Sequence, residues 1–418
     1  MPRFLSALFL LTLSFTLWGQ SRCVVLDSLS RAPLPKATIF DNEGRVVALT
    51  SDKGVIPYVS ASAYPITIRY IGYEPVTVAA PGAYTVLMNT AISDLPEMVV
   101  TSRKNQILHM LAYVREFSTL TTYSDTVFLF REKVVDYMLP DRAVRRFYGW
   151  STPRVLASKS YYHFTNSEGL DSVSDAFPEH FSWCDWIGVI KSTDLPLTLR
   201  DTTCGTDTTM AKYTPAIVWR RYEDKAELDI DVLADRENYK WVPAIRTYLD
   251  TDMDFRRLDL KYAFHNVSDT VVTAKNISAY SFHMESNGRG RNLKRLFDSP
   301  GPAYVDTYAE VYVVDSEYIS VREARKWEGK HMASNQIDIE LPPYVPDLDV
   351  SVHRLIDRVE KVNHGDARLF VKPDHRLGRE QKRRGFLKYL KAMLGIYSSK
   401  VNYQMPSRTG NKKSEAEK

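Results

Sequence analysis

The feature that most constrains the fold is a series of short apolar runs, separated by turn residues, that fills residues 21–92. The runs are too short for helices and show no helical period. Asn42-Glu-Gly44 and Asp52-Lys-Gly54 mark hairpin corners, because glycine tolerates positive φ. Seven runs occur, at residues 24–26, 37–40, 46–49, 55–56, 66–70, 76–78 and 83–87. This spacing predicts a small antiparallel β-sandwich of seven strands.

Four pieces of this region occur in an order that is typical of one family. They are Val25-Leu-Asp-Ser28, Ala32-Pro-Leu-Pro-Lys-Ala37, Ser51-Asp-Lys-Gly54 and Ile68-Arg-Tyr-Ile-Gly72-Tyr73. Together they resemble the carboxypeptidase-regulatory-like domain, a transthyretin-like β-sandwich that is abundant in exported proteins of Bacteroidota-type bacteria. Lys36 departs from the glycine that is usual in that family. The resemblance implies an accessory module without catalytic residues. The rest of the chain resembles only uncharacterised exported proteins that carry the same module.

Residues 1–19 have the pattern of a signal peptide. Arg3 precedes an apolar run over residues 4–18, and Gly19-Gln20 offers a small residue for cleavage. The run is shorter than the roughly 20 residues that span a bilayer as a helix, which favours cleavage over an uncleaved anchor. We therefore expect an exported protein that is periplasmic or associated with the outer membrane.

Export also bears on the three cysteines, which lie at positions 23, 184 and 204. An oxidising compartment permits a disulfide between Cys184 and Cys204, and two unpaired thiols are the alternative. Cys184 stands between Trp183 and Trp186, a setting that favours a packed core or a disulfide over a nucleophile.

A larger β-rich domain with a few helices is predicted over residues 105–345, after a linker strand at 93–104. Apolar and polar residues alternate over 257–264 and 303–314, as in half-buried antiparallel strands. The domain is expected to open with a helix, because five apolar residues fall at helical spacing: Ile107, Met110, Leu111, Val114 and Phe117. The chain is therefore expected to be mainly β.

Helices are predicted at two later places. Ser320 and Glu323 form a capping box for a helix that stops near Gly329. Residues 346–397 are predicted to be terminal helices, because the apolar residues of the first follow helical spacing: Val352, Leu355, Ile356, Val359 and Val362.

The C-terminal part of the chain is basic. The net charge is +4, whereas residues 376–418 alone hold 12 Lys or Arg against 3 Glu. A basic amphipathic helix over residues 380–397 suits peripheral contact with an anionic membrane surface. Packing of that helix on the body of the protein is the alternative. Residues 398–418 are expected to be a basic disordered tail, and an exported protein is not expected to bind nucleic acid.

Motifs for known catalytic chemistry are absent from the sequence. It has no His-Glu-x-x-His, no Gly-x-Ser-x-Gly and no glycine-rich phosphate loop. His353 and Glu360 lie about two helical turns apart, roughly 10 Å, which is too far for one ion. Asp250-Thr-Asp-Met-Asp254 begins like a calcium loop, but Phe255 stands where glycine is needed. We therefore expect no metal, no cofactor and no catalytic residue from motifs.

Two groups of residues remain as candidate binding sites. One group shares a face of the predicted strand at 303–314, where aromatic rings suit sugars and carboxylates accept hydroxyl hydrogen bonds. It comprises Tyr304, Asp306, Tyr308, Glu310 and Tyr312. A covering helix or domain over this face is the alternative. The other group surrounds a predicted hairpin tip and suits an anion, with a solvated turn as the alternative. It comprises Arg289, Arg291, Lys294 and Arg295.

These patterns favour a non-catalytic binding or interaction protein of the cell envelope, with an envelope protein or a glycan as its partner. The alternative is an exported hydrolase that acts on glycan or peptide and has its site within residues 105–345. Such a site would be assembled from residues distant in the sequence.

Overall fold

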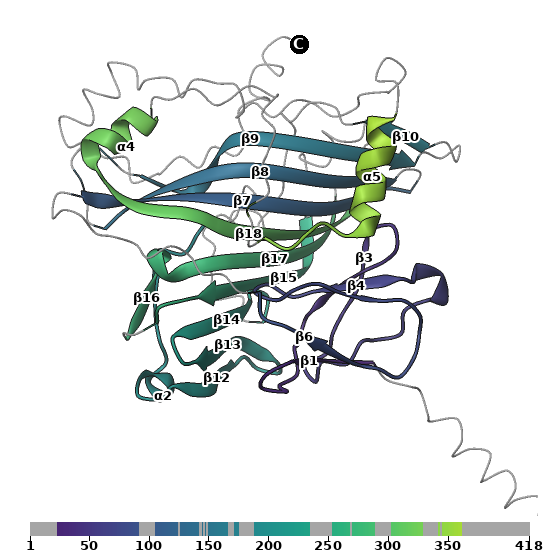
Figure 1. Ribbon diagram of the computed structural model, residues 1–418, viewed down its shortest axis with the longest axis horizontal. Coiled ribbons are helices and arrows are strands. Elements are labelled where there is room, and N and C mark those ends of the chain that lie inside the picture. The colour runs from purple at the N-terminus through teal and green to yellow at the C-terminus, as the bar shows by residue number, and fades with distance from the viewer. Residues whose placement is uncertain are drawn as a thin grey trace, which may run out of the picture. The chain divides into compact units, whose positions relative to one another are not determined.

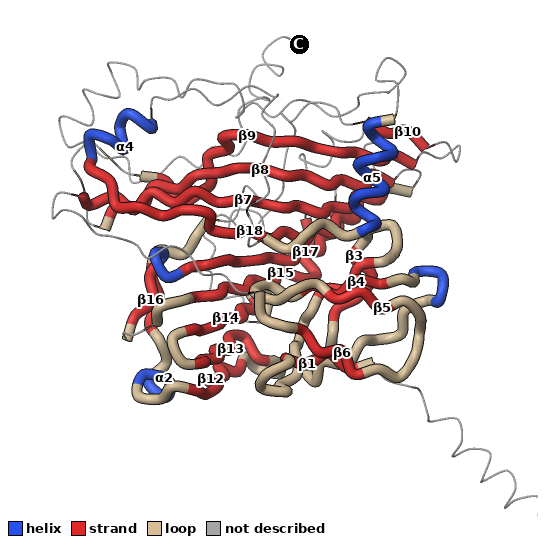
Figure 2. The backbone as a smooth tube through the Cα atoms, in the orientation of Figure 1, coloured by secondary structure: helices blue, strands red, loops and turns tan. Residues whose placement is uncertain are grey.

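The computed structural model describes residues 23–91, 105–123, 126–141, 149–165, 171–174, 188–234, 253–267, 270–288, 302–328 and 345–361, with positions 144, 147 and 342. Strands dominate this part of the chain (Figure 2), which confirms the mainly β class. The chain divides into two compact units. The N-terminal unit comprises residues 1–92 and 346–352, and the large unit comprises residues 93–345 and 353–418. Among the described residues, no helix is both long enough and apolar enough to cross a bilayer.

The N-terminal unit contains two small sheets. Its strands are β1 Val24–Asp27, β2 Thr38–Phe40, β3 Val46–Leu49, β4 Ile66–Arg69, β5 Val76–Val78 and β6 Thr85–Met88. β3, β2, β4 and β5 pair antiparallel in that order, whereas β1 and β6 pair in parallel. The predicted run at 55–56 contributes only an isolated bridge from Val55 to Val24. The described part of this unit therefore has six strands in place of the predicted seven, and one pair is not antiparallel.

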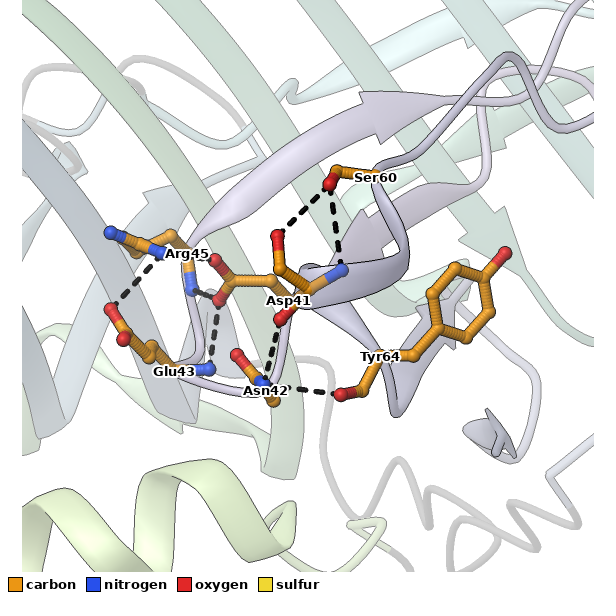
Figure 3. Close-up of polar contacts among 7 residues, drawn as sticks. Asp41, Asn42, Glu43, Arg45, Ser60 and Tyr64 are labelled. Carbon is orange, nitrogen blue, oxygen red and sulfur yellow. Dashed lines mark hydrogen bonds and ion pairs between the residues drawn. The ribbon is translucent and has the colours of Figure 1, made fainter. Parts of the chain in front are cut away.

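The β2–β3 hairpin shows how local sequence sets a corner of this unit. Gly44 has a φ of +80°, a left-handed conformation that glycine adopts without strain. The Asp41 carboxylate accepts hydrogen bonds from the backbone N–H of Arg45 at 2.8 Å and from its Nε at 2.8 Å (Figure 3). The Asn42 side-chain amide donates to the Tyr64 carbonyl at 3.1 Å, which ties the corner to the segment before β4. The corner predicted here is confirmed.

β4 ends in a buried arginine that holds a distant segment. The Arg69 side chain is 1% exposed, and its Nε donates to the Asp349 carboxylate at 2.9 Å. The same guanidinium donates to the Asp347 carbonyl at 3.4 Å. The segment Pro346–Val352 thus belongs to the N-terminal unit, although its sequence suggests only the start of a terminal helix.

The helix predicted after residue 346 is present as α5, Val350–Glu360. Three residues of its predicted apolar stripe are buried, namely Val352, Leu355 and Val359. The helical spacing read from the sequence is therefore confirmed for this element.

The large unit is built on one ten-stranded antiparallel sheet (Figure 1). In sheet order its strands are β10 Asp171–Ser174, β9 Trp150–Thr165, β8 Thr126–Pro140, β7 Asn105–Thr121, β18 Ala303–Ser320, β17 Ile277–Gly288, β15 Met253–Phe264, β14 Lys225–Asp231, β13 Pro215–Tyr222 and β12 Cys204–Met210. A second pair, β11 Ser192–Asp194 and β16 Val271–Thr273, lies beside two short helical turns, α2 Leu197–Arg200 and η4 Ala274–Asn276. The two strands predicted from alternation are confirmed within β15 and β18.

The prediction of a helix at the start of this unit is wrong. Residues 105–121 form β7, which pairs with β8 and β18. Leu108, Met110 and Val114 are buried on one face of this strand, and Ile107 and Phe117 are buried on the other. A strand buried on both faces loses the alternation that identifies a strand, so its apolar residues match helical spacing by coincidence.

β18 leads directly into α4, Val321–Glu328. The predicted capping box is confirmed, because the Ser320 backbone N–H donates to the Glu323 carboxylate at 2.9 Å and the Glu323 N–H donates to the Ser320 Oγ at 3.3 Å. Arg154 links the end of α4 to the sheet by donating to the Trp327 carbonyl at 2.6 Å. A buried carboxylate, Asp136, accepts from Arg154 Nε at 2.9 Å and lies 3.4 Å from His109 Nε2.

Candidate functional site

A row of charged residues crosses one face of the large sheet, called the polar face below. Each member lies directly opposite the next across neighbouring strands, from β14 to β9. The row comprises Asp229, Lys261, Ser281, Glu310, Arg115, Glu132 and Lys159. Acidic and basic residues alternate on either side of Ser281, and opposite charges placed directly across a sheet stabilise the strand pairing. This row therefore stabilises the pairing and the register of the strands.

An aromatic row lies beside the charged row on the same face. In register it runs through Asp259, His283, Tyr308, Phe117, Phe130 and Tyr161. The ring centroids of Phe117 and Phe130 are 5.2 Å apart, and those of Phe130 and Tyr161 are 6.1 Å apart. Tyr308 lies 6.3 Å from Phe117 and 6.2 Å from the His283 ring. Tyr308 is therefore part of a buried aromatic stack.

The five residues predicted on β18 lie on the polar face but fall into two groups. Tyr308, Glu310 and Tyr312 are buried. The two tyrosine hydroxyls donate to the two oxygens of the Glu310 carboxylate, each at 3.1 Å. These three side chains are therefore packed within the protein, where their polar atoms bond to one another. Tyr304 and Asp306 are only partly buried and lie where the face reaches solvent.

Tyr304 and Asp306 meet three residues from β15 and β17 to form what we call the histidine–carboxylate cluster. Its members are Arg257, His283, Glu285, Tyr304 and Asp306. The cluster forms because Arg257, Glu285 and Asp306 lie directly opposite one another on three adjacent strands. His283 and Glu285 are two positions apart on β17, so both side chains project to the same face of the sheet.

Hydrogen bonds and ion pairs connect the cluster. His283 Nε2 lies 2.7 Å from Asp306 Oδ1 and 3.9 Å from Glu285 Oε1. Arg257 Nε lies 3.1 Å from Glu285 Oε1, and the Tyr304 hydroxyl donates to Glu285 Oε2 at 3.1 Å. Burial, together with the neighbouring Asp306 and Glu285 carboxylates, raises the pKa of Tyr304, so the hydroxyl stays protonated and donates. The cluster is a set of polar groups that hold one another in place.

The cluster offers one nitrogen and two carboxylate oxygens to a ligand. These three atoms, from His283, Glu285 and Asp306, all lie within 4.8 Å of one another. Imidazole nitrogen with carboxylate oxygen is a donor set that divalent transition metals accept. The same carboxylates also accept hydrogen bonds from hydroxyl groups, and Arg257, 33% exposed, donates them.

The sequence identified two members of this cluster and missed three. Arg257, His283 and Glu285 were missed because they belong to no catalytic or metal-binding motif of the sequence. His283-Met-Glu285 and Tyr304-Val-Asp306 each hold two polar residues separated by one residue, the spacing that places both side chains on one face of a strand. The partnership between the two pairs is set by the register of β17 against β18.

Several other predictions lie outside the described residues. They concern the anion-binding residues Arg289, Arg291, Lys294 and Arg295, the linker at 93–104, the signal segment, the basic helix at 380–397 and the tail at 398–418. Cys184 is also outside, whereas Cys204 is exposed at the start of β12, so the disulfide stays a prediction.

Comparison with known proteins does not assign a function. No family model matches the chain, and no curated protein matches it. The resemblance of residues 21–92 therefore rests on their sequence, and the function of the large unit is argued from its geometry.

Proposed function

We propose that the chain is an exported, non-catalytic binding protein of the cell envelope, and that its N-terminal unit is a carboxypeptidase-regulatory-like, transthyretin-like β-sandwich. Two small sheets with an apolar core support this assignment. Gly54 and Gly72, which belong to the resembling motifs, adopt positive φ of +70° and +82°. The named residues of these motifs serve turns, strands and packing, in keeping with an accessory role.

The observation that carries the binding function is the histidine–carboxylate cluster at the solvent-facing part of the polar face. Much of the rest of that face is occupied by the buried aromatic stack and the charged row. Here, however, Asp306 and Glu285 are 14% and 20% exposed and Arg257 is 33% exposed. Carboxylate acceptors beside a guanidinium donor suit a ligand rich in hydroxyl groups. We propose a glycan of the envelope as the ligand class.

Glycan binding is tested with the chain lacking residues 1–19 on a glycan array, followed by titration of the strongest hit. Asp306→Asn and Arg257→Gln are expected to weaken binding about 10-fold or more, equivalent to roughly 1.4 kcal/mol each. Asp315→Asn is the matched control, because Asp315 is an exposed acid on the same strand. Equal binding by all four proteins would remove the cluster from the proposed site.

A hydrolase is the second candidate, and the paired carboxylates favour it. Glu285 and Asp306 lie directly opposite each other across β17 and β18, with carboxylate oxygens within 4.8 Å. Retaining glycosidases place two carboxyl groups about 5–5.5 Å apart. The assay is release of new reducing ends from the bound glycan, with Glu285→Gln as the inactive comparison. Release that Glu285→Gln abolishes would replace the binding function by catalysis.

We also propose that the protein is periplasmic or associated with the outer membrane, and that residues 380–397 contact an anionic membrane surface. The basic composition of residues 376–418 and the signal-like segment support this location. Cell fractionation with and without residues 376–418 is the test. Envelope association that persists in the truncated protein would refute the role of the basic helix.

A further inference from the structure

We propose that His283, Glu285 and Asp306 bind one divalent transition-metal ion, with Zn²⁺ as the representative. This inference rests on the proposed function in one respect, because the metal ion and the glycan are both assigned to the histidine–carboxylate cluster. It departs from the expectation of no metal, which came from the absence of metal-binding motifs in the sequence. The residues come from β17 and β18, which lie side by side in the sheet (Figure 1).

The distances among the three donor atoms suit a single ion. Zinc lies about 2.0–2.2 Å from imidazole nitrogen and carboxylate oxygen, so two ligands of one ion are separated by up to about 4 Å. His283 Nε2 lies 2.7 Å from Asp306 Oδ1 and 3.9 Å from Glu285 Oε1. The Glu285 and Asp306 carboxylate oxygens lie within 4.8 Å of each other, so side-chain rotations would bring all three donors around one ion while the pairing of β17 with β18 holds their backbones in register.

The charges in the cluster leave room for a cation. Glu285 and Asp306 supply two negative charges, and Arg257 supplies one positive charge close to Glu285 Oε1. A further acid, Asp259, lies directly opposite His283 on β15, and Lys261 lies two positions beyond it. Together, Arg257, Glu285 and Asp306 carry a net negative charge. A bound divalent ion would reverse that sign and draw both carboxylates inward.

The hydrogen bonding of His283 is the independent observation. Its ring is 5% exposed and its Nε2 is directed at the two carboxylates, whereas its Nδ1 is buried and has no hydrogen-bond partner among the described residues. His283 thus presents Nε2, from a buried ring, to the same two carboxylates that would complete the ligand set of a metal ion.

Arg257 competes with the ion for Glu285. Its Nε lies 3.1 Å from Glu285 Oε1, the same oxygen that approaches His283. Because Arg257 is partly exposed, its side chain is free to turn toward solvent when a metal takes its place. This competition gives a signature that an ordinary ion-pair network lacks, namely that removal of Arg257 strengthens metal binding.

The experiment is Zn²⁺ titration of the full chain by calorimetry in a Cys204→Ser background, which removes an exposed thiol. One equivalent of Zn²⁺ is expected to bind. His283→Gln and Asp306→Asn are expected to weaken it at least 10-fold, and Arg257→Gln to tighten it several-fold. His353→Gln is the control, because His353 is an exposed histidine on α5 and its loss is expected to leave binding unchanged. Circular dichroism of each variant shows whether it is folded.

A second measurement does not depend on variants. Crystals of the parent chain soaked in Zn²⁺ are expected to show an anomalous peak within bonding distance of His283 Nε2. Binding that is unaffected by His283→Gln, a peak elsewhere only, or no binding at all would each overturn the metal site.

Glycan titration with and without EDTA separates the metal site from the proposed glycan binding. Zinc binding without glycan binding refutes the proposed function alone, and glycan binding without zinc binding refutes the metal site alone.

Discussion

The N-terminal unit and the large unit use strands in contrasting ways. Strands of the N-terminal unit have three or four residues and surround an apolar core, with buried charges confined to a few positions such as Arg69 and Asp41. Strands of the large unit reach 18 residues, and the sheet buries charged residues such as Arg115, Lys133 and Asp136. The comparison teaches that the small unit depends on turns and apolar packing, whereas the large unit also depends on paired charges.

The largest expected effect is on the buried charges of the large unit. Asp136→Ala leaves Arg154 without the carboxylate that accepts its Nε at 2.9 Å and its Nη2 at 2.6 Å. Removing one partner of a buried ion pair costs about 3–5 kcal/mol of unfolding free energy. Urea unfolding measures the loss, and Asp315→Ala, at an exposed position of β18, is expected to change stability by less than about 0.5 kcal/mol. Equal losses in the two variants would contradict the role of paired charges.

A smaller loss is expected when the corresponding charge in the N-terminal unit is removed. Asp349→Ala removes the carboxylate that accepts from Arg69 Nε at 2.9 Å but leaves the Asp347 carbonyl, and it is expected to cost about 1.5–3 kcal/mol, the value of a hydrogen bond to a charged group. Hydrogen exchange should show faster exchange in β4 than in the parent protein. Asp357→Ala, an exposed acid on α5, is the control. Unchanged exchange in β4 would show that the Arg69 contact does not stabilise this unit.

The polar face of the large unit should also make stability depend on pH. Burial, with a further contribution from Asp229, raises the pKa of Glu227 to about 7, although Arg220 and Lys261 oppose the rise. In the unfolded chain this carboxyl titrates near its ordinary value of about 4.3, so between that pH and 7 the folded state holds a proton that the unfolded state has lost. Stability therefore falls as pH rises through this window.

Glu227→Gln should remove this dependence. The loss across the window is on the order of 2 kcal/mol, because the side chain retains 17% exposure that screens part of the effect. Urea unfolding at pH 4.5, 6 and 7.5 measures it in the parent and in the variant. A parent protein whose stability rises through this window while that of Glu227→Gln stays flat would reverse the sign and refute the prediction.

The smallest effects concern helix caps. Ser320→Ala removes the Oγ that accepts the Glu323 N–H at 3.3 Å and is expected to cost about 1 kcal/mol. Ser60→Ala removes the cap of a one-turn 3-10 helix, η1 Ala61–Ala63, in the N-terminal unit, and its long bond of 3.4 Å predicts a smaller cost. The midpoint temperature of thermal unfolding is measured for both variants and for the parent protein. A larger shift for Ser60→Ala would show that η1 matters more than α4 for stability.

Most of the fold class was predictable because its signals are local. Glycine corners, the capping box at Ser320, the stripe of α5 and the alternation in β15 and β18 depend on residues a few positions apart. The failure at β7 has a physical cause, since this strand is covered on both faces and its sequence no longer alternates. The parallel pairing of β1 with β6 was missed because short apolar runs do not encode strand direction.

The candidate site was predicted in part. Tyr304 and Asp306 were found through alternation on one strand, but the same pattern also included Tyr308, Glu310 and Tyr312, which are buried. Alternation predicts which residues share a face but does not show which part of that face reaches solvent. The three partners on β15 and β17 required the strand register.

The sequence by itself determined where strands, corners and helix caps form, because these depend on backbone preferences and hydrogen bonds between near neighbours. Tertiary structure alone decided which charges are buried and paired, as in Glu310 opposite Arg115. It also decided that His283 and Glu285 meet Asp306. The physical reason is that sheet register is a collective property of many strands, and each side chain gains its partner only when two distant segments align.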